Sequence, residues 1–194
     1  MILSEGQVIV MMKFFRTDDQ IIREVDKICD GCWIQMINPS SEECKEIADS
    51  LMVDIEDIQA ALDVEESSRI ELQDGYTLIL VDIPVIEERN DKEWYGTIPL
   101  GIILTDKLIF TVCLEETPIL TAFMDGRVRN FFTYKKTRFI LQILYKNATM
   151  FLHYLRIIDK KSEVIEKNLH ESQKNYELIE LLELEKSLVY FTTS

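Results

Sequence analysis

The stretch TIPLGIILTDKLIFTVCL, residues 97–114, decides the fold class because it holds two apolar runs joined by a short polar connection. The runs Thr97–Leu104 and Leu108–Leu114 are far shorter than the ~18 apolar residues of a membrane-spanning helix. Runs of this length are typical of strands that are buried in a sheet. The connection Thr105–Lys107 is short enough to predict a hairpin.

Strand and helix signals alternate through the first two-thirds of the chain. Ser40 and Glu43 form a capping box that opens a helix, and Asp74-Gly75 is a turn signal between two strand-like runs. The remaining strands are predicted at Val8–Phe15, Cys32–Asn38, Arg69–Leu72 and Tyr76–Pro84. Helices are predicted from Ser40 to about Leu51, over Ile55–Leu62 after an Asp54 cap, and from Thr117-Pro118 to about Arg129. This alternation predicts an α/β fold.

From Lys136 onward the periodicity is helical. Spacings of three or four predict a long helix whose apolar seam comprises Leu144, Ala148, Phe151, Leu155, Ile158, Ile165 and Leu169. A second helical run carries Leu178, Leu181, Leu184, Leu188 and Phe191 on one face. The two runs predict an antiparallel helical hairpin with its turn near residues 170–174. We therefore expect an α/β domain over residues 1–134 and helices over residues 135–194.

The second helical pattern is still running at Tyr190 and Phe191, with no glycine, proline or basic last turn before Ser194. We therefore expect that helix to continue in a longer protein. The N-terminus has no basic region followed by an apolar run and a cleavage site, so a cytosolic location is expected.

The chain is strongly acidic, with a formal net charge of −14. Residues 42–74 hold twelve acidic residues and only Lys45 and Arg69 as bases, a local charge of −10. This balance argues against nucleic acid or an anionic membrane surface as a partner. The acidic segment is a solvated surface, a site that attracts cations, or a surface that meets basic residues of a neighbouring subunit. A basic cluster comprises Arg127, Arg129, Lys135, Lys136 and Arg138.

Cys29 and Cys32 have the spacing of a zinc-binding or redox pair. A structural zinc site needs a second pair of ligands, whereas the only histidines, His153 and His170, lie apart in helical sequence. A thioredoxin-like site places a helix after the pair, but the residues that follow Cys32 are strand-like. We therefore predict reduced thiols and a turn at Gly31 that leads into a strand.

Enzyme motifs are lacking in the sequence, because the six glycines are scattered and no Gly-x-Ser-x-Gly elbow occurs. A small soluble α/β enzyme, with a site assembled only in the fold, stays open as an alternative. Carboxylates are abundant instead, and hard cations such as Mg²⁺ prefer oxygen ligands. The candidate ligands are Asp54, Glu56, Asp57, Asp63, Glu65 and Glu66.

Three strings resemble the cytoplasmic part of CorA-type magnesium and cobalt (divalent-cation) transporters: ALDVEESSRIE at 61–71, TIPLGIILT at 97–105 and LELEKSLVYF at 182–191. The resemblance begins at about residue 12. It implies an α/β/α sandwich with a mixed sheet, then a helical hairpin and the start of a long stalk helix. It also implies a homopentamer on the cytoplasmic face of the cell membrane, with the membrane helices and the Gly-Met-Asn pore signature beyond Ser194.

The resemblance further implies a regulatory metal site. In this family, Mg²⁺ bound between neighbouring cytoplasmic domains favours the closed channel, and an acidic pair on a short helix contributes ligands. Glu56 and Asp57 resemble that pair, with Asp63 as a further carboxylate, whereas an ungapped alignment puts Gln59 and Ala60 there. The expected function is therefore a cytoplasmic regulatory domain that senses Mg²⁺ at subunit interfaces. A structural or assembly module without metal sensing is the alternative.

Overall fold

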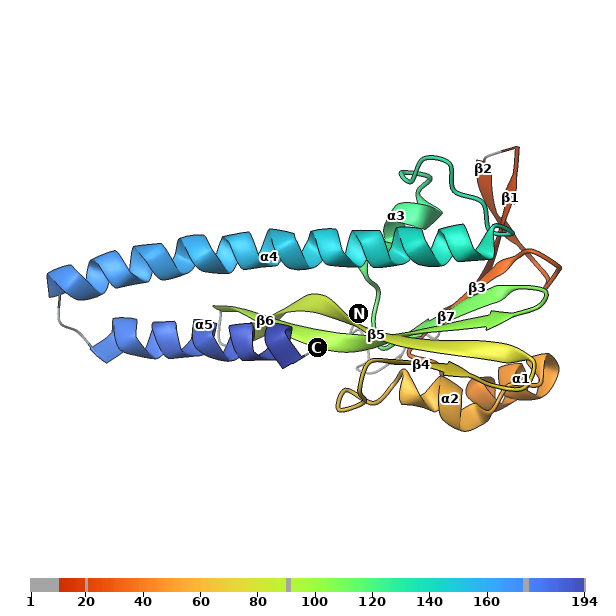
Figure 1. Cartoon of the computed structure of the whole chain (residues 1–194), viewed down its shortest axis with the longest axis horizontal. Coiled ribbons are helices and arrows are strands. Elements are labelled where there is room, and N and C mark those ends of the chain that lie inside the picture. The colour runs from red at the N-terminus through yellow and green to blue at the C-terminus, as the bar shows by residue number, and fades with distance from the viewer. Residues whose placement is uncertain (1–10, 20, 90–91, 173–174, 194) are drawn as a thin grey trace, which may run out of the picture.

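One mixed sheet forms the centre of the protein in the computed structural model, which describes residues 11–19, 21–89, 92–172 and 175–193 (Figure 1). Seven strands lie in the order β2-β1-β3-β7-β6-β5-β4. Strands β3 and β7 are parallel, and the other neighbouring pairs are antiparallel. The strands are β1 (Met11–Asp18), β2 (Ile21–Val25), β3 (Trp33–Ile37), β4 (Arg69–Leu72), β5 (Tyr76–Arg89), β6 (Lys92–Thr105) and β7 (Ile109–Cys113).

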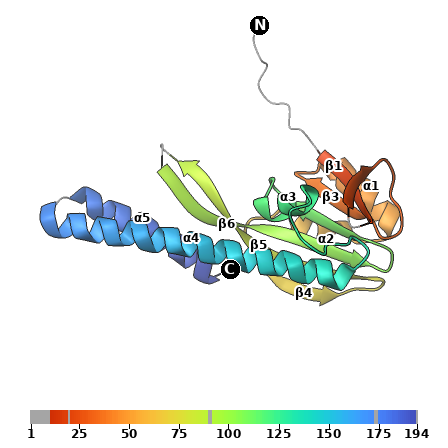
Figure 2. The ribbon, with the colours of Figure 1, turned by 90° about the horizontal axis from the view of Figure 1, so that it is seen from above.

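Helices cover both faces of this sheet. Helices α1 (Ser41–Leu51) and α2 (Ile55–Ala60) lie on one face, and α3 (Pro118–Met124) and α4 (Lys136–Ser172) lie on the other (Figure 1). Helix α5 (Asn175–Thr193) runs back beside the distal half of α4, as Figure 2 also shows. The predicted α/β/α sandwich with a mixed sheet and a helical hairpin is therefore confirmed. The division of the chain at residue 134 stays a prediction.

Strand β3 is buried along its whole length because both of its faces carry a core. Trp33 faces the α3 and α4 side, where its ring centroid lies 5.0 Å from that of Phe139. Its indole Nε1 donates to Thr111 Oγ1 over 2.9 Å, so the polar atom of this buried ring is satisfied. Ile34 and Met36 belong to the second core, under α1 and α2.

The local signals for the helices on the α1 and α2 face are confirmed. The amide of Ser40 donates to Glu43 Oε2 over 2.8 Å, and the amide of Glu43 donates to Ser40 Oγ over 3.3 Å, which completes the capping box. Asp54 caps α2 by accepting from the amide of Glu56 over 3.0 Å. Both predicted hairpins, β4–β5 and β6–β7, are also present.

Several predicted boundaries are wrong. Helix α3 ends at Met124 rather than near Arg129, because the chain turns at Gly126, whose φ is +67°. Helix α2 ends at Ala60, two residues early. Strand β1 runs on to Asp18, and the part of the predicted strand Val8–Phe15 before residue 11 lies outside the described residues.

Strand β2 was not predicted, and β5 and β6 are longer than expected. The five residues of β2, Ile-Ile-Arg-Glu-Val, are exposed or half-buried and show no alternation of apolar and polar residues, so the sequence carries no clear strand pattern. Strands β5 and β6 extend to Arg89 and Lys92, well past the predicted ends at Pro84 and Thr97. Figure 2 shows this extended hairpin projecting from the sheet at the end where α4 and α5 also extend beyond it.

The predicted seam of α4 is only partly correct. Ala148 is exposed, whereas Ile143, Asn147 and Tyr154 are buried. The side of α4 that faces the sheet therefore includes Asn147 and Tyr154, whose polar groups do not fit an apolar pattern in the sequence. Phe151 lies on the α5 side, where its ring centroid is 5.1 Å from that of Phe191. The predicted turn at 170–174 lies partly outside the described residues.

Candidate functional site

The first turn of α2 is tied to the first residue of β5 by a tyrosine hydroxyl. Tyr76 donates to Asp57 Oδ2 over 2.5 Å and accepts from the amide of Asp54 over 3.2 Å. Asp57 is 9% exposed, so this hydroxyl satisfies a carboxylate that is almost out of water. Tyr76 therefore fixes the position of two of the acidic residues singled out in the sequence.

The contact also changes the titration of the tyrosine. Burial raises the pKa of Tyr76 to about 12, and the hydrogen bond to the Asp57 carboxylate contributes to the rise. The hydroxyl therefore keeps its proton at neutral pH and acts as a donor. One face of the Asp57 carboxylate is consequently occupied within the chain.

The other two predicted ligands are exposed and lie at different points of the fold. Glu56 is on the first turn of α2, and Asp63 is in the loop after α2, where its Oδ1 accepts from the amide of Glu65 over 3.0 Å. Among the residues that the structure describes, no three His, Cys, Asp or Glu side chains are grouped so that they could hold a metal ion. A cation site at Glu56, Asp57 and Asp63 stays a prediction.

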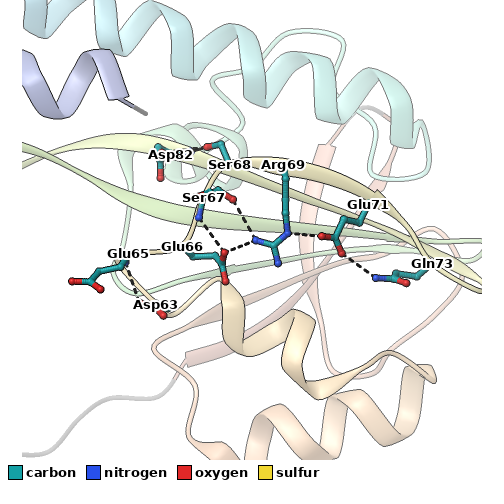
Figure 3. Close-up of polar contacts among 9 residues, drawn as sticks. All are labelled: Asp63, Glu65, Glu66, Ser67, Ser68, Arg69, Glu71, Gln73 and Asp82. Carbon is teal, nitrogen blue, oxygen red and sulfur yellow. Dashed lines mark hydrogen bonds and ion pairs between the residues drawn. The ribbon is translucent and has the colours of Figure 1, made fainter.

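Arg69, the first residue of β4, bonds one carboxylate of the preceding loop and one of β4 itself (Figure 3). Its Nη1 lies 2.6 Å from Glu66 Oε1, and its Nε lies 2.6 Å from Glu71 Oε1. Arg69 Nη1 also donates to the carbonyl of Ser67 over 3.3 Å. One guanidinium thus compensates two carboxylates, and these two are the least available for an external cation.

Asp82 joins this loop to helix α4. The amide of Asp82 donates to Ser68 Oγ over 3.0 Å, and Ser68 Oγ donates to Asp82 Oδ2 over 3.2 Å. On the α4 side, the carbonyl of Asp82 accepts from Asn147 Nδ2 over 2.8 Å. Burial raises the pKa of the Asp82 carboxyl, while the hydrogen bond from Ser68 opposes the rise. Figure 3 shows Asp82 beside Ser68, away from the Arg69 group.

The acidic segment therefore has two parts with different electrostatics. Glu66 and Glu71 are paired with Arg69, whereas Glu42, Glu46 and Glu56 are exposed on α1 and α2. Exposed like charges repel one another, and they repel the same surface of a second copy more strongly as that copy approaches. A divalent cation that lies between two such surfaces would remove this repulsion.

A cleft of about 1100 Å³ lies between the extended β5–β6 hairpin and helices α4 and α5. Lys161 Nζ donates to Glu93 Oε2 over 2.7 Å and to the Tyr95 hydroxyl over 2.9 Å. The Lys161 ammonium and the Tyr95 hydroxyl lower the pKa of the Glu93 carboxyl. Lys92 Nζ lies 3.2 Å from Glu180 Oε1 of α5. These charges hold the hairpin against both helices.

No pattern in the sequence predicted this cleft. The only local signal is the aromatic pair Trp94-Tyr95, which follows the charged residues Lys92 and Glu93 and indicates a cleft only once α4 and α5 are placed beside it. No described helix is long and apolar enough to cross a lipid bilayer.

Comparisons with known proteins identify relatives of this chain. Residues 30–194 match the family model described as CorA-like Mg2+ transporter protein. The cobalt/magnesium transport protein CorA of Methanocaldococcus jannaschii is 25% identical over 171 residues, which cover 84% of this chain and 51% of that protein. The chain thus spans about half the length of this curated relative.

Solved structures share the fold. The soluble domain of CorA from Methanocaldococcus jannaschii matches with a TM-score of 0.81 at 21% identity, over 97% of this chain and 76% of that one. The complete CorA magnesium transporter of the same organism matches with a TM-score of 0.77 at 19% identity, over 95% and 59%. The cytoplasmic domain of ZntB from Vibrio parahaemolyticus matches with a TM-score of 0.69 at 10% identity, over 94% and 73%.

Proposed function

The chain belongs to the family of CorA-like Mg2+ transporter proteins, and on this premise we propose that it is the cytoplasmic regulatory domain of a divalent-cation transporter. The observation that carries the proposal is the match of residues 30–194 to the family model. The likeness of the fold to a soluble CorA domain, over 97% of the chain, supports the same assignment. The domain would lie at the cytoplasmic face of the cell membrane and assemble with copies of itself.

The proposed regulatory ligand is Mg²⁺, bound between two copies by carboxylates of α2 and of the loop after it. Glu56 and Asp63 are exposed, and Asp57 is fixed by Tyr76 with one oxygen already bonded. Mg²⁺ keeps several of its waters and uses only one or two carboxylates from a protein. Two copies, each contributing such a carboxylate, are therefore sufficient for a site that one chain does not complete.

The mechanism would be linkage between ion binding and assembly. An ion that binds the assembled state better than the separated state shifts the equilibrium towards assembly. In a transporter, the assembled arrangement of the cytoplasmic domains would be the closed one. A fall in Mg²⁺ would then release the domains from one another.

Titration with MgCl₂ tests this proposal. With a Kd of about 1 mM, as in weak carboxylate sites, 10 mM Mg²⁺ would stabilise the bound state by about 1.4 kcal/mol. This raises the Tm by roughly 3–6 °C for a domain of this size. Sedimentation velocity should show a parallel shift to larger species. NaCl at the same ionic strength is the control, and equal responses to the two salts would contradict the proposal.

Two variants locate the site. Glu56→Gln should abolish the Mg²⁺ response, and Asp57→Asn should weaken it while keeping an acceptor for the Tyr76 hydroxyl. Glu46→Gln removes an exposed carboxylate from α1 in the same acidic segment and is the matched control. If all three variants respond to Mg²⁺ as the unaltered chain does, the ion binds elsewhere.

Transport itself is tested in the source organism. Deletion of the gene that encodes this chain should lower the uptake of Mg²⁺ and Co²⁺ and raise tolerance to toxic Co²⁺. Complementation with the gene should restore both. Unchanged uptake of both ions would contradict a role in their transport.

Assembly without metal sensing is the second candidate function, and the outer surface of α4 favours it. Leu141 and Tyr145 are 61% and 75% exposed there, and Leu152 follows on the same side. Basic residues such as Arg138 flank this stripe, while the acidic residues of α1 lie on the opposite layer. Opposite charges on opposite layers favour a head-to-tail contact between copies, the kind that closes rings. Oligomers that are insensitive to Mg²⁺ but lost in Tyr145→Glu would support this candidate.

A further inference from the structure

Cys29 and Cys32 flank the turn between β2 and β3, and their backbones are close enough for a disulfide. The amide of Cys32 donates to the carbonyl of Cys29 over 3.1 Å, and Gly31 has a φ of +76°, so the four residues form a β-turn. The first and fourth Cα atoms of a β-turn are less than about 7 Å apart. Disulfides join Cα atoms that are about 4.4–6.8 Å apart.

The two sulfur atoms differ in access. Cys32 is fully buried, and its Sγ accepts from the amide of Cys29 over 3.5 Å, so it lies directly over the Cys29 backbone. Cys29 is partly exposed. Burial raises the pKa of the Cys32 thiol, and the neighbouring Cys29 sulfur raises it further. A small molecule in solution therefore reaches Cys29 and not Cys32.

A positive charge lies beside the accessible sulfur. Arg16 Nη1, on β1, is 3.9 Å from Cys29 Sγ. The Nε of the same guanidinium lies 3.5 Å from Asp18 Oδ1, an exposed ion pair that leaves Nη1 facing the thiol, where it attracts anionic groups that approach. Oxidised glutathione is such a molecule, since it carries carboxylates beside its disulfide.

We propose that Cys29 and Cys32 are a modification site that closes reversibly to a disulfide by exchange with small-molecule disulfides such as oxidised glutathione. The Cys29 sulfur attacks one sulfur of oxidised glutathione and forms a mixed disulfide as the glutathione S–S bond breaks, and one glutathione leaves as the thiol with the proton of Cys29. The Cys32 sulfur then attacks Cys29 Sγ, and the second glutathione leaves with the proton of Cys32. The protein loses two hydrogens and the glutathione disulfide gains two. Excess reduced glutathione reverses both steps.

The turn that holds the two cysteines is hydrogen-bonded to a neighbouring part of the sheet. The amide of Gly31 donates to the carbonyl of Lys107 over 2.8 Å, and the amide of Ile109 donates to the carbonyl of Cys32 over 3.4 Å. The pair therefore lies where the β2–β3 turn joins the connection between β6 and β7. Disulfides that form transiently in reducing compartments are usually redox-sensing. The inference is independent of the proposed Mg²⁺ response.

Mass spectrometry tests the proposal on the whole chain. The folded protein is equilibrated with mixtures of oxidised and reduced glutathione, quenched in acid and measured without reduction. We expect the mass to fall by two hydrogens in oxidising mixtures and to return in reducing ones. Cys32→Ala should instead gain one glutathione, because the mixed disulfide at Cys29 has no thiol to resolve it. Cys29→Ala should stay unmodified.

Two further variants complete the design. The double variant Cys44→Ser, Cys113→Ser removes the two buried thiols of α1 and β7 and should still lose two hydrogens. Arg16→Gln should slow formation of the disulfide several-fold without changing its end point. The proposal is overturned if the unaltered chain does not lose two hydrogens, or if Cys29→Ala loses them equally well.

Discussion

The hydroxyl of Tyr76 donates to Asp57 Oδ2 over 2.5 Å and so connects the start of β5 to the first turn of α2. This contact positions the acidic pair that the proposed function uses. Tyr76→Phe removes the hydroxyl, so the almost buried Asp57 carboxylate loses this hydrogen bond. A hydrogen bond to a charged group contributes about 1.5–3 kcal/mol, and we expect the free energy of unfolding to fall by that amount. Urea denaturation measures the loss.

Tyr145→Phe is the matched control for this experiment. Tyr145 lies on α4 and is 75% exposed, so loss of its hydroxyl should leave the stability within about 0.5 kcal/mol of the unaltered chain. Equal effects of the two substitutions would show that the Tyr76 contact does not stabilise the fold.

Alkaline pH should destabilise the fold through the same tyrosine. The folded-state pKa of Tyr76 is raised from 10.0 to about 12, so the folded state favours the protonated hydroxyl. This contribution is fully present below pH 10 and is lost as the pH rises towards 12. The difference in unfolding free energy between the unaltered chain and Tyr76→Phe should therefore shrink over this window. A constant difference would contradict the assignment, whatever the other tyrosines do.

Local sequence signals predicted the elements whose hydrogen bonds are local. The capping box at Ser40 and Glu43 is present because both partners lie within one helical turn. Strand β2 was missed because its short run Ile-Ile-Arg-Glu-Val does not alternate apolar and polar residues, and its pairing with β1 alone makes it a strand. The ends of β5 and β6 were missed because residues such as Glu88 and Glu93 pair across the hairpin and not with a core.

The candidate site was predicted only at the level of residue type. The acidic segment was evident, but the contact of Tyr76 with Asp57 joins a helix and a strand 19 residues apart. Spacing along the chain does not reveal which of several carboxylates will receive that hydroxyl. The error in the predicted seam of α4 has the same cause. Asn147 is buried although it is polar, because it donates to the carbonyl of Asp82, and spacing along the chain does not reveal that contact.

Arg69 should stabilise the loop before β4 by pairing with two carboxylates. Its side chain is 31% exposed, and partly exposed ion pairs contribute about 0.2–1 kcal/mol each. We expect Arg69→Gln to cost about 1 kcal/mol at low salt and much less in 1 M NaCl, where the Debye length is about 3 Å. Lys45→Gln, which removes the other base of the acidic segment, is the control for net charge. A loss that does not depend on salt would exclude the ion pairs as its cause.

Lys161 should hold the extended β5–β6 hairpin on α4. Its ammonium bonds both Glu93 and Tyr95, and Lys161→Gln should increase amide hydrogen exchange at the tip of the hairpin. Because the folded-state pKa of Glu93 is lowered from 4.5, the contribution of this carboxylate is present above that pH and is lost as the pH falls below it. The difference between Lys161→Gln and the unaltered chain should therefore diminish on acidification. Lys160→Gln is the control, because it alters the exposed lysine next to Lys161, and it should leave hydrogen exchange unchanged.

The packing of α2 on β6 depends on the absence of a side chain at Gly101. A Cβ at this position would lie 2.6 Å from the Cβ of Ala61, which caps α2. Gly101→Ala should therefore destabilise the fold by about 1–3 kcal/mol, the usual cost of overpacking a core. Ala61→Gly removes the opposing methyl group, and the double variant should recover much of the loss. The coupling energy from this double-mutant cycle should be about 1 kcal/mol or more, because the two groups are in direct contact.

Gly96→Ala provides the comparison on the same strand. A Cβ at Gly96 would have its nearest neighbour at 3.8 Å, so this substitution should be tolerated. Thermal unfolding of Gly96→Ala, Gly101→Ala, Ala61→Gly and the double variant distinguishes a local clash at Gly101 from a general requirement for glycine in β6. Strictly additive effects of Gly101→Ala and Ala61→Gly would show that α2 is not seated on β6 through this contact. The Mg²⁺ response of Gly101→Ala should fall together with its stability, because a shift of α2 moves Glu56 and Asp57 with it.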